Sequence, residues 1–305
     1  MSALQPTDSS LFFSRHDSTD PRLGEKAMGD GRDVALIGYP DDEGIRLNGG
    51  REGAKAGPAE IRRWLYKMTP HPQRRLKDFR DEGDLKITGE LGARHDSAVA
   101  QVFPWLKDGR QVLSFGGGND YAYADGAAFL RAFAKRKPLV INVDAHFDVR
   151  PSTKNFNSGT PFYRLLEQDI DFDFVEFGIQ PQCNARAHWD YVKKKGGHII
   201  SVEDQLASGK SWLAYSKQRL KVLAKKSRPT FLAIDIDAFA LPYAPGASSS
   251  WPLGLTPHEF WPVFLFWLKQ LDVRVLGIYE TSPALDASNA AAKWAAQLAH
   301  GFLHV

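Results

Sequence analysis

The chain has 305 residues, of which 43% are hydrophobic and 12% aromatic, enough to fill a large core. Its net charge of +3, with both signs well mixed, gives no argument for nucleic-acid binding. Its apolar runs are too short to span a membrane, and a single cysteine, Cys183, excludes a disulfide framework and favours a cytoplasmic protein.

Residues 1–30 are polar and lack the apolar segment of a secretory signal. We expect them to form a loosely ordered N-terminal extension or an interface arm. No linker divides the remainder, so residues 31–305 are predicted to be a single domain.

Eight segments read as strands, most of them separated by segments of helical length. The predicted strands are Val34–Gly38, Leu85–Gly89, Gln111–Phe115, Leu139–Val143, Phe174–Gly178, His198–Val202, Phe231–Ile236 and Val273–Ile278. The predicted helices include Pro58–Lys67, Ser97–Lys107, Gly126–Ala134, Asn184–Lys195, Ser211–Lys226 and Thr256–Leu271, the last with a Thr-x-x-Glu capping box. This alternation predicts a mostly parallel sheet with helices on both faces.

Acids or amides follow five of these strands at the point where each strand ends. They are Asp41–Glu43, Gly116–Asp120, Asp144, Asp235 with Asp237, and Glu280. Because ligands bind at the carboxyl ends of strands in an open parallel sheet, these residues are expected to form one site.

The densest of these groups is Asp144-Ala-His146-Phe-Asp148, at the end of a strand that reads as buried on both faces. Asp235 and Asp237 lie at i and i+2 of an extended segment and therefore share a face. Carboxylates at a buried strand end need a compensating charge, and four aspartates with one histidine suit Mn²⁺. Four carboxylates balance two divalent ions, which can share a hydroxide as the nucleophile. Either motif alone has a plainer alternative, a surface turn or helix start.

The Asp144–Asp148 motif followed by Arg150, the Asp235-Ile-Asp237 pair and the glycine-rich turn upstream resemble the three metal motifs of the arginase/agmatinase/formimidoylglutamase family, the ureohydrolases. The resemblance runs from about Val34 to the C-terminus. It implies a three-layer α/β/α domain with a mostly parallel eight-stranded sheet. It also implies hydrolysis at a guanidino or amidino carbon with a Mn²⁺ pair, in a homo-trimer or hexamer.

Within the family, Asp42–Arg46, Asn48–Arg51 and Asn157–Phe162 resemble the formimidoylglutamase branch. Phe162 stands near the place where arginases and agmatinases usually carry a histidine, and Gly116–Gly118 has glycine where arginases have aspartate. The resemblance favours hydrolysis of N-formimidoyl-L-glutamate to L-glutamate and formamide, in histidine breakdown, by attack of a metal-activated hydroxide on the amidine carbon. A guanidino-acid or agmatine-type hydrolase that releases urea is the alternative.

The resemblance also assigns metal ligands. Asp144 and Asp235 would bridge two Mn²⁺ ions, with His146 and Asp237 completing one site. The other site would contain Asp148 and Asn119.

For the substrate, the resemblance assigns Glu280 to the amidinium or guanidinium and Asp148 to proton transfer toward the leaving amine. The carboxylates of an acidic substrate need cations, which points to Arg150 first and then to Arg51. Asn48 and Ser158, in the same motifs, are further candidates for substrate binding. Arg164 also lies in the motif-bearing loops, and a structural or surface role is expected for both Arg51 and Arg164.

Asn119 departs from the family, which has a histidine ligand at this position. Its amide oxygen could bind the metal instead, Asp120 could replace it, one metal site could be weak or empty, or the turn could be misaligned. A metal-poor relative without catalytic activity is therefore a further alternative. The other histidines are expected to have packing or surface roles: His95, His188, His198, His258, His300 and His304.

Overall fold

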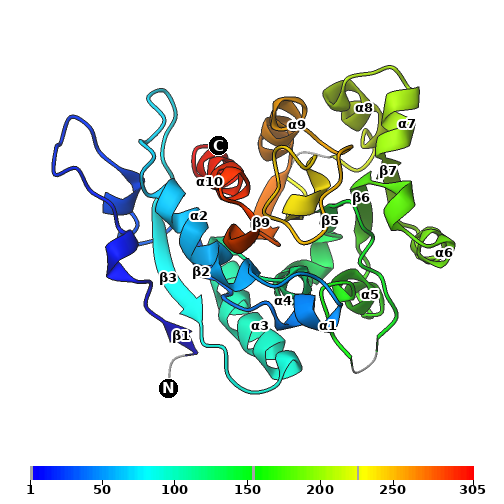
Figure 1. Ribbon diagram of the computed structural model, residues 1–305, viewed down its shortest axis with the longest axis horizontal. Helices are drawn as coiled ribbons and strands as arrows, with labels where there is room; N and C mark the ends of the chain where they lie inside the picture. Colours follow the sequence, from blue (N-terminus) through cyan, green and yellow to red (C-terminus); the bar gives the residue numbers. More distant parts are fainter. Residues whose placement is uncertain (1–2, 153–154, 225–226) are drawn as a thin grey trace.

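In the computed structural model, which describes residues 3–152, 155–224 and 227–305, nine strands form one sheet in the order β1-β3-β2-β4-β9-β8-β5-β6-β7 (Figure 1). The strands are β1 Leu4–Gln5, β2 Val34–Gly38, β3 Phe79–Leu85, β4 Gln111–Phe115, β5 Leu139–Val143, β6 Asp173–Ile179, β7 His198–Ser201, β8 Pro229–Asp235 and β9 Asp272–Tyr279. Every neighbouring pair is parallel except β1 with β3. The mostly parallel sheet is confirmed, with one short strand added at its edge.

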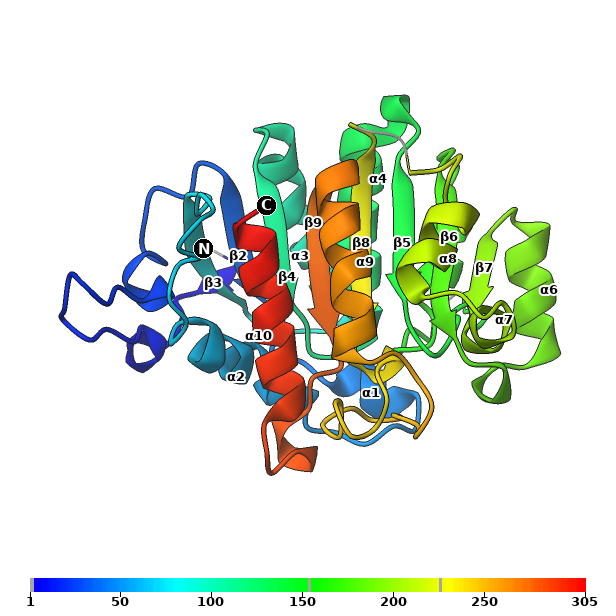
Figure 2. The same cartoon turned by 90° about the horizontal axis from the view of Figure 1, so that it is seen from above.

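Helices cover both faces of this sheet (Figure 2). The α-helices of the described residues are α1 Glu43–Leu47, α2 Gly57–Leu65, α3 Leu91–Lys107, α4 Ala122–Phe133, α5 Pro161–Leu166, α6 Arg186–Lys194, α7 Val202–Ala207, α8 Trp212–Arg219, α9 Pro257–Gln270 and α10 Ala290–Leu303. In Figure 2, α9 and α10 lie in front of the sheet and α3 and α4 behind it. The three-layer α/β/α architecture is therefore confirmed.

The strand β5 shows why the sheet is buried on both sides. Its residues Leu139, Ile141 and Val143 belong to the apolar cluster that contains α9 and α10, whereas Val140 belongs to the cluster that contains α3 and α4. Successive side chains of a strand point to opposite faces, so a strand between two helix layers needs an unbroken apolar run.

Several predicted helices have different ends in the structure. The helices α3 and α4 begin before Ser97 and Gly126, and α8 ends at Arg219, well before the predicted end. Lys225 and Lys226 lie outside the described residues. The capping box of α9 is confirmed, because the Thr256 hydroxyl accepts a hydrogen bond from the backbone N–H of Glu259 at 3.3 Å.

The strand predicted at Leu85–Gly89 is wrong, because the structure has β3 at Phe79–Leu85. This segment, Phe-Arg-Asp-Glu-Gly-Asp-Leu, alternates buried and more exposed residues but contains a buried acid, Asp81. Arg62 of α2 compensates that acid with two hydrogen bonds of 2.8 and 2.9 Å. Because one core-facing position of β3 is charged, apolar residues do not occupy every second position of the strand. The strand is therefore hard to recognise in the sequence.

The N-terminal extension is packed against the sheet rather than loose. Leu4 and Gln5 pair with β3, and Leu11 and Leu23 are buried in the core. A small number of buried apolar residues therefore anchors this otherwise polar extension. The extension covers an edge of the sheet that would otherwise present unpaired backbone groups.

Replacing Arg62 by Met is expected to destabilise the fold by about 3–5 kcal/mol, because it leaves the buried carboxylate of Asp81 without its positively charged partner. The side chain of Arg62 is fully buried, whereas the neighbouring Arg63 is half-exposed and pairs with Glu60. Arg63→Met, the matched control, should change the free energy of unfolding in urea by less than about 1 kcal/mol. Equal effects of the two replacements would contradict this account.

Candidate metal centre and substrate pocket

Neighbouring strands deliver the predicted site residues to one edge of the sheet. Asp144 follows β5, Asp235 ends β8, and Glu280 follows β9, while Asn119 lies in the turn after β4. These strands are consecutive in the sheet, in the order β4-β9-β8-β5. The parallel arrangement therefore brings together side chains that are up to 161 residues apart, as between Asn119 and Glu280.

The potential ligand atoms form two groups that share Asp144. In the first, atoms of Asp144, His146 and Asp237 lie within 4.8 Å of one another, and in the second the same holds for Asp144, Asp148 and Asp235. His146 Nδ1 lies 3.1 Å from Asp237 Oδ2 and 3.4 Å from Asp144 Oδ1. Two groups with one shared carboxylate are the arrangement that a pair of adjacent divalent ions requires.

The electrostatics of this cluster call for added positive charge. Burial, together with repulsion from neighbouring carboxylates, raises the pKa of Asp144, Asp235 and Glu280 well above the usual range. Burial raises the pKa of Asp148 to about 6. For His146, burial opposes the charged form, but the charge of Asp237 prevails and raises its pKa.

Two buried oxygens in the site, Oδ1 of Asp237 and Oδ1 of Asn119, have no hydrogen-bond partner within the described part of the chain. Buried polar atoms normally have a partner, so these two are available as ligands. Oxygen donors with one imidazole are also the donor set that Mn²⁺ prefers. The residues present therefore fit a pair of such ions.

The backbone is strained at two of the acids. Asp148 and Glu280 have positive φ angles of 49° and 64°, in the left-handed region that such residues rarely adopt. Each such residue costs about 1–3 kcal/mol and persists only where its surroundings enforce it. For Glu280 the surroundings are the glycine-rich turn: its N–H donates to Gly117 O at 2.8 Å, and its carboxylate accepts from the N–H of Asn119 at 3.0 Å.

Asn119 points into the cluster. Its Nδ2 donates to Asp148 Oδ2 at 2.7 Å and lies 3.3 Å from Asp144 Oδ2. The turn thus places this amide against the acids of the second group of potential ligands.

Asp120, the alternative ligand, is turned away from the cluster. Its Oδ2 lies 2.7 Å from His95 Nε2, and Arg164 donates to His95 Nδ1 at 2.8 Å, so the ring donates its remaining proton to Asp120. Gly44 packs so closely that a Cβ there would lie 2.1 Å from Asp120 Oδ1. The interpretation in which Asp120 replaces the histidine ligand is therefore wrong for this conformation.

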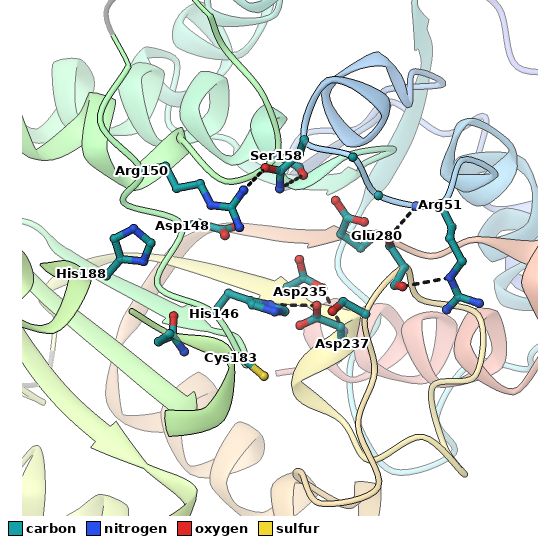
Figure 3. A pocket seen from close by; sticks show the side chains of 16 residues that line it. Arg51, His146, Asp148, Arg150, Ser158, Cys183, His188, Asp235, Asp237 and Glu280 are labelled. Atoms are coloured by element: carbon teal, nitrogen blue, oxygen red, sulfur yellow. Dashed lines mark hydrogen bonds and ion pairs between the residues drawn. The ribbon is translucent and has the colours of Figure 1, made fainter. Parts of the chain in front are cut away.

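A pocket of about 420 Å³ opens in front of the cluster (Figure 3). On its wall Arg150 Nη1 donates to Asn48 Oδ1, and Asn48 Nδ2 donates to Ser158 Oγ at 3.0 Å. The structure thus brings together three of the residues assigned to substrate binding. Glu280 lies at the other side of the pocket, with 4% of its surface exposed.

Arg51 and Arg164 have structural contacts. Arg51 donates from Nε to Ser248 O at 3.1 Å and from Nη2 to Ala247 O at 2.9 Å, so it joins two loops at the rim of the pocket. Arg164 lies between the rings of Tyr123 and Phe156, 3.3 and 3.6 Å from their centroids. The structural role expected for both arginines agrees with these contacts. Arg51 also lines the pocket, but it has fewer free donors than Arg150.

Sequence reasoning missed two features of the site. His188 of α6, expected to have a packing or surface role, lines the pocket, and no motif marks it. Glu176 of β6 is fully buried behind the cluster: Asn142 Nδ2 donates to Glu176 Oε2 at 2.9 Å and lies 3.3 Å from Asp144 Oδ2. The sequence signal for this buried pair was a polar residue inside each of two otherwise apolar strands, Asn142 in β5 and Glu176 in β6.

The arginase family profile matches residues 32–304. The chain belongs to the arginase family. It is 30% identical over 314 residues to a formimidoylglutamase of Legionella pneumophila, with 97% of this chain and 96% of the relative covered. These matches confirm the resemblance drawn from the metal motifs.

Solved structures of the family have the same fold. The formiminoglutamase of Trypanosoma cruzi with Mn²⁺ aligns with a TM-score of 0.83 at 30% identity, covering 93% of this chain and 98% of that one. The formimidoylglutamase of Bacillus subtilis aligns with a TM-score of 0.86 at 26% identity, covering 95% of this chain and 93% of that one.

Within the described residues of this arginase-family chain, no helix has the length and apolar character needed to cross a membrane.

Glu176→Gln should flatten the pH dependence of stability in the metal-free protein. Burial raises the pKa of Glu176 well above its usual range, so folding takes up a proton once the unfolded chain is ionised. The contribution of Glu176 to the free energy of unfolding is fully present below about pH 4.5. As the pH rises toward the pKa of Glu176 in the folded protein, this contribution is lost by up to about 1.4 kcal/mol per pH unit.

The measurement is urea unfolding at pH 5, 6 and 7 with a chelator present. Glu176→Gln has no proton to take up, so its stability should fall less steeply than that of the wild type. Glu203→Gln, a replacement at an exposed site, should leave the slope unchanged. A wild-type slope in the Glu176→Gln variant would show that Glu176 is charged in the fold.

Proposed function

We propose that this protein hydrolyses the linear amidine N-formimidoyl-L-glutamate to L-glutamate and formamide, with two Mn²⁺ ions per chain. The observation that carries the proposal is the pair of potential ligand groups that share Asp144 at the end of a pocket with an acidic side and a basic side. The formimidoylglutamase relatives, which this chain matches over almost its whole length, support the same choice of substrate.

Asp144, which belongs to both ligand groups, would hold both ions, with His146 and Asp237 at one of them. Asp235 lies in the group of Asp148, and the family resemblance supports it as the second ligand shared by the two ions. Asp148 and Asn119 would complete the other, because a half-turn of the Asn119 amide exchanges Nδ2 for the unpartnered Oδ1. When bound, the ions supply Lewis-acid charge and a water molecule of lowered pKa.

The other groups of the chain bind and orient the substrate. The Glu280 carboxylate accepts charge-assisted hydrogen bonds from the amidinium, and the glycine-rich turn fixes its position. Asp148 carries a proton to the departing amine, so that the C–N bond breaks as glutamate leaves with a neutral amino group. Arg150 binds a substrate carboxylate, with Asn48 and Ser158 holding the guanidinium in place.

We further propose a cytoplasmic homo-oligomer, trimeric or hexameric. Its hydrolase domain would comprise residues 31–305, with residues 1–30 as an extension. The presence of a single cysteine supports the cytoplasmic location, and the family resemblance supports the trimeric or hexameric assembly.

The test is to load chelator-treated protein with Mn²⁺, measure the ions bound per chain, and identify the product. We expect two ions, and formamide from N-formimidoyl-L-glutamate. If the protein releases urea from a guanidino acid or agmatine, and no formamide from N-formimidoyl-L-glutamate, the proposed substrate is wrong. Fewer than one tightly bound ion and no turnover of any of these compounds would identify a metal-poor relative.

Replacing Glu280 by Gln is expected to lower kcat/KM by about 10- to 100-fold, the loss that corresponds to one hydrogen bond to a charged group. Because Glu280 belongs to neither potential ligand group, the Mn²⁺ content should stay at the wild-type value. Glu203→Gln, a surface replacement of the same kind, should leave both quantities unchanged. Loss of metal with loss of activity would instead give Glu280 a role in the metal site.

A further inference from the structure

Two basic side chains of the pocket lie on the side away from Glu280 (Figure 3). Arg150 follows β5, two residues beyond Asp148, and His188 lies in the first turn of α6. They come from different elements, and no sequence motif contains both.

The imidazole of His188 is half-buried and has no hydrogen-bond or ion-pair partner among residues 3–152, 155–224 and 227–305. Within the described part of the chain, the Arg150 guanidinium makes one side-chain hydrogen bond, from Nη1 to Asn48, so its other N–H groups are free to bind a ligand. Two basic groups that face one cavity with unused donors are a site for an anion.

Their charges also act on each other. Burial, and then the positive charge of Arg150, lowers the pKa of His188. An anion between the two side chains would remove this repulsion and would accept hydrogen bonds from both. On the other side of the cavity, the carboxylate of Glu280 and the nearby Asp237 disfavour an anion.

A substrate with a cationic head and an anionic tail matches this division of the pocket. In an amidino derivative of glutamate, the α-carboxylate is next to the amidine nitrogen, and the side-chain carboxylate lies three carbons beyond Cα. If the amidine occupies the Glu280 side, the side-chain carboxylate is the group that extends toward the opposite wall. Agmatine-type substrates would place an ammonium there, which Arg150 would repel.

We propose that His188 and Arg150 form a clamp for the distal carboxylate of the substrate, and that this clamp selects acid-tailed amidines over amine-tailed ones. The proposal rests on the proposed function for the direction in which the substrate lies. The clamp itself concerns only the binding of a carboxylate and can be tested without turnover.

The experiment is calorimetric titration of the Mn²⁺-loaded protein with L-glutamate and with L-glutamine. The two differ only in that the distal group is a carboxylate in one and a neutral amide of the same shape in the other. The wild type should bind L-glutamate at least about 10-fold more tightly than L-glutamine. His188→Gln should reduce this preference by about 5-fold, by weakening L-glutamate binding while leaving L-glutamine binding unchanged, and Arg150 should retain the remainder.

His188→Glu should weaken L-glutamate binding further, through repulsion. His198→Gln, the same replacement on an exposed residue of β7 outside this pocket, should preserve the preference. An undiminished preference for L-glutamate in His188→Gln, or its absence in the wild type, overturns the clamp.

A formamide assay on the same wild-type sample separates the two proposals. If L-glutamate binds through His188 but no formamide forms, the reaction is wrong and the clamp stands. If formamide forms and the His188 variants keep the wild-type preference, the reaction stands and the clamp is wrong.

Discussion

Repulsion among carboxylates at the ends of β5, β8 and β9 is the constraint on which the rest of this structure depends. Free carboxylates would move apart into water, but here the parallel sheet fixes the backbone from which each of them extends. The helix layers remove much of the water that would screen them. The fold therefore holds a concentration of negative charge that cations must balance, and the donor atoms are arranged so that two divalent ions would do so.

Holding the acids in this arrangement requires support from outside the cluster. Asp148 and Glu280 have left-handed backbone conformations, and at Glu280 the glycine-rich turn after β4 stabilises this conformation through two hydrogen bonds. At that turn, Asp120, His95 and Arg164 form a chain of hydrogen bonds that holds the Asp120 carboxylate away from the site. Hydrogen-bonded groups next to the strained backbone therefore help to hold it in place.

The sequence was informative wherever the relevant signal is local. Asp144, His146 and Asp148 are close together in the chain, and strand ends predict where Asp235 and Glu280 must meet them. The strand β3 was placed too late because Arg62, its charge partner, lies in a helix 19 residues before Asp81. His188 was missed because its position in the pocket depends on the rotation and docking of α6, which no short-range pattern specifies.

The position of His188 also bears on how this family can diversify. The acids proposed as metal ligands follow central strands that pack on both faces, where most replacements would disturb the core. His188 belongs to a half-exposed helix between β6 and β7, at the periphery of the sheet. Mutations in that helix can alter which tail the pocket accepts while the hydrolytic apparatus stays intact. The proposed clamp therefore places substrate selection and bond-breaking chemistry in different parts of the fold, so that a change in the first need not disturb the second.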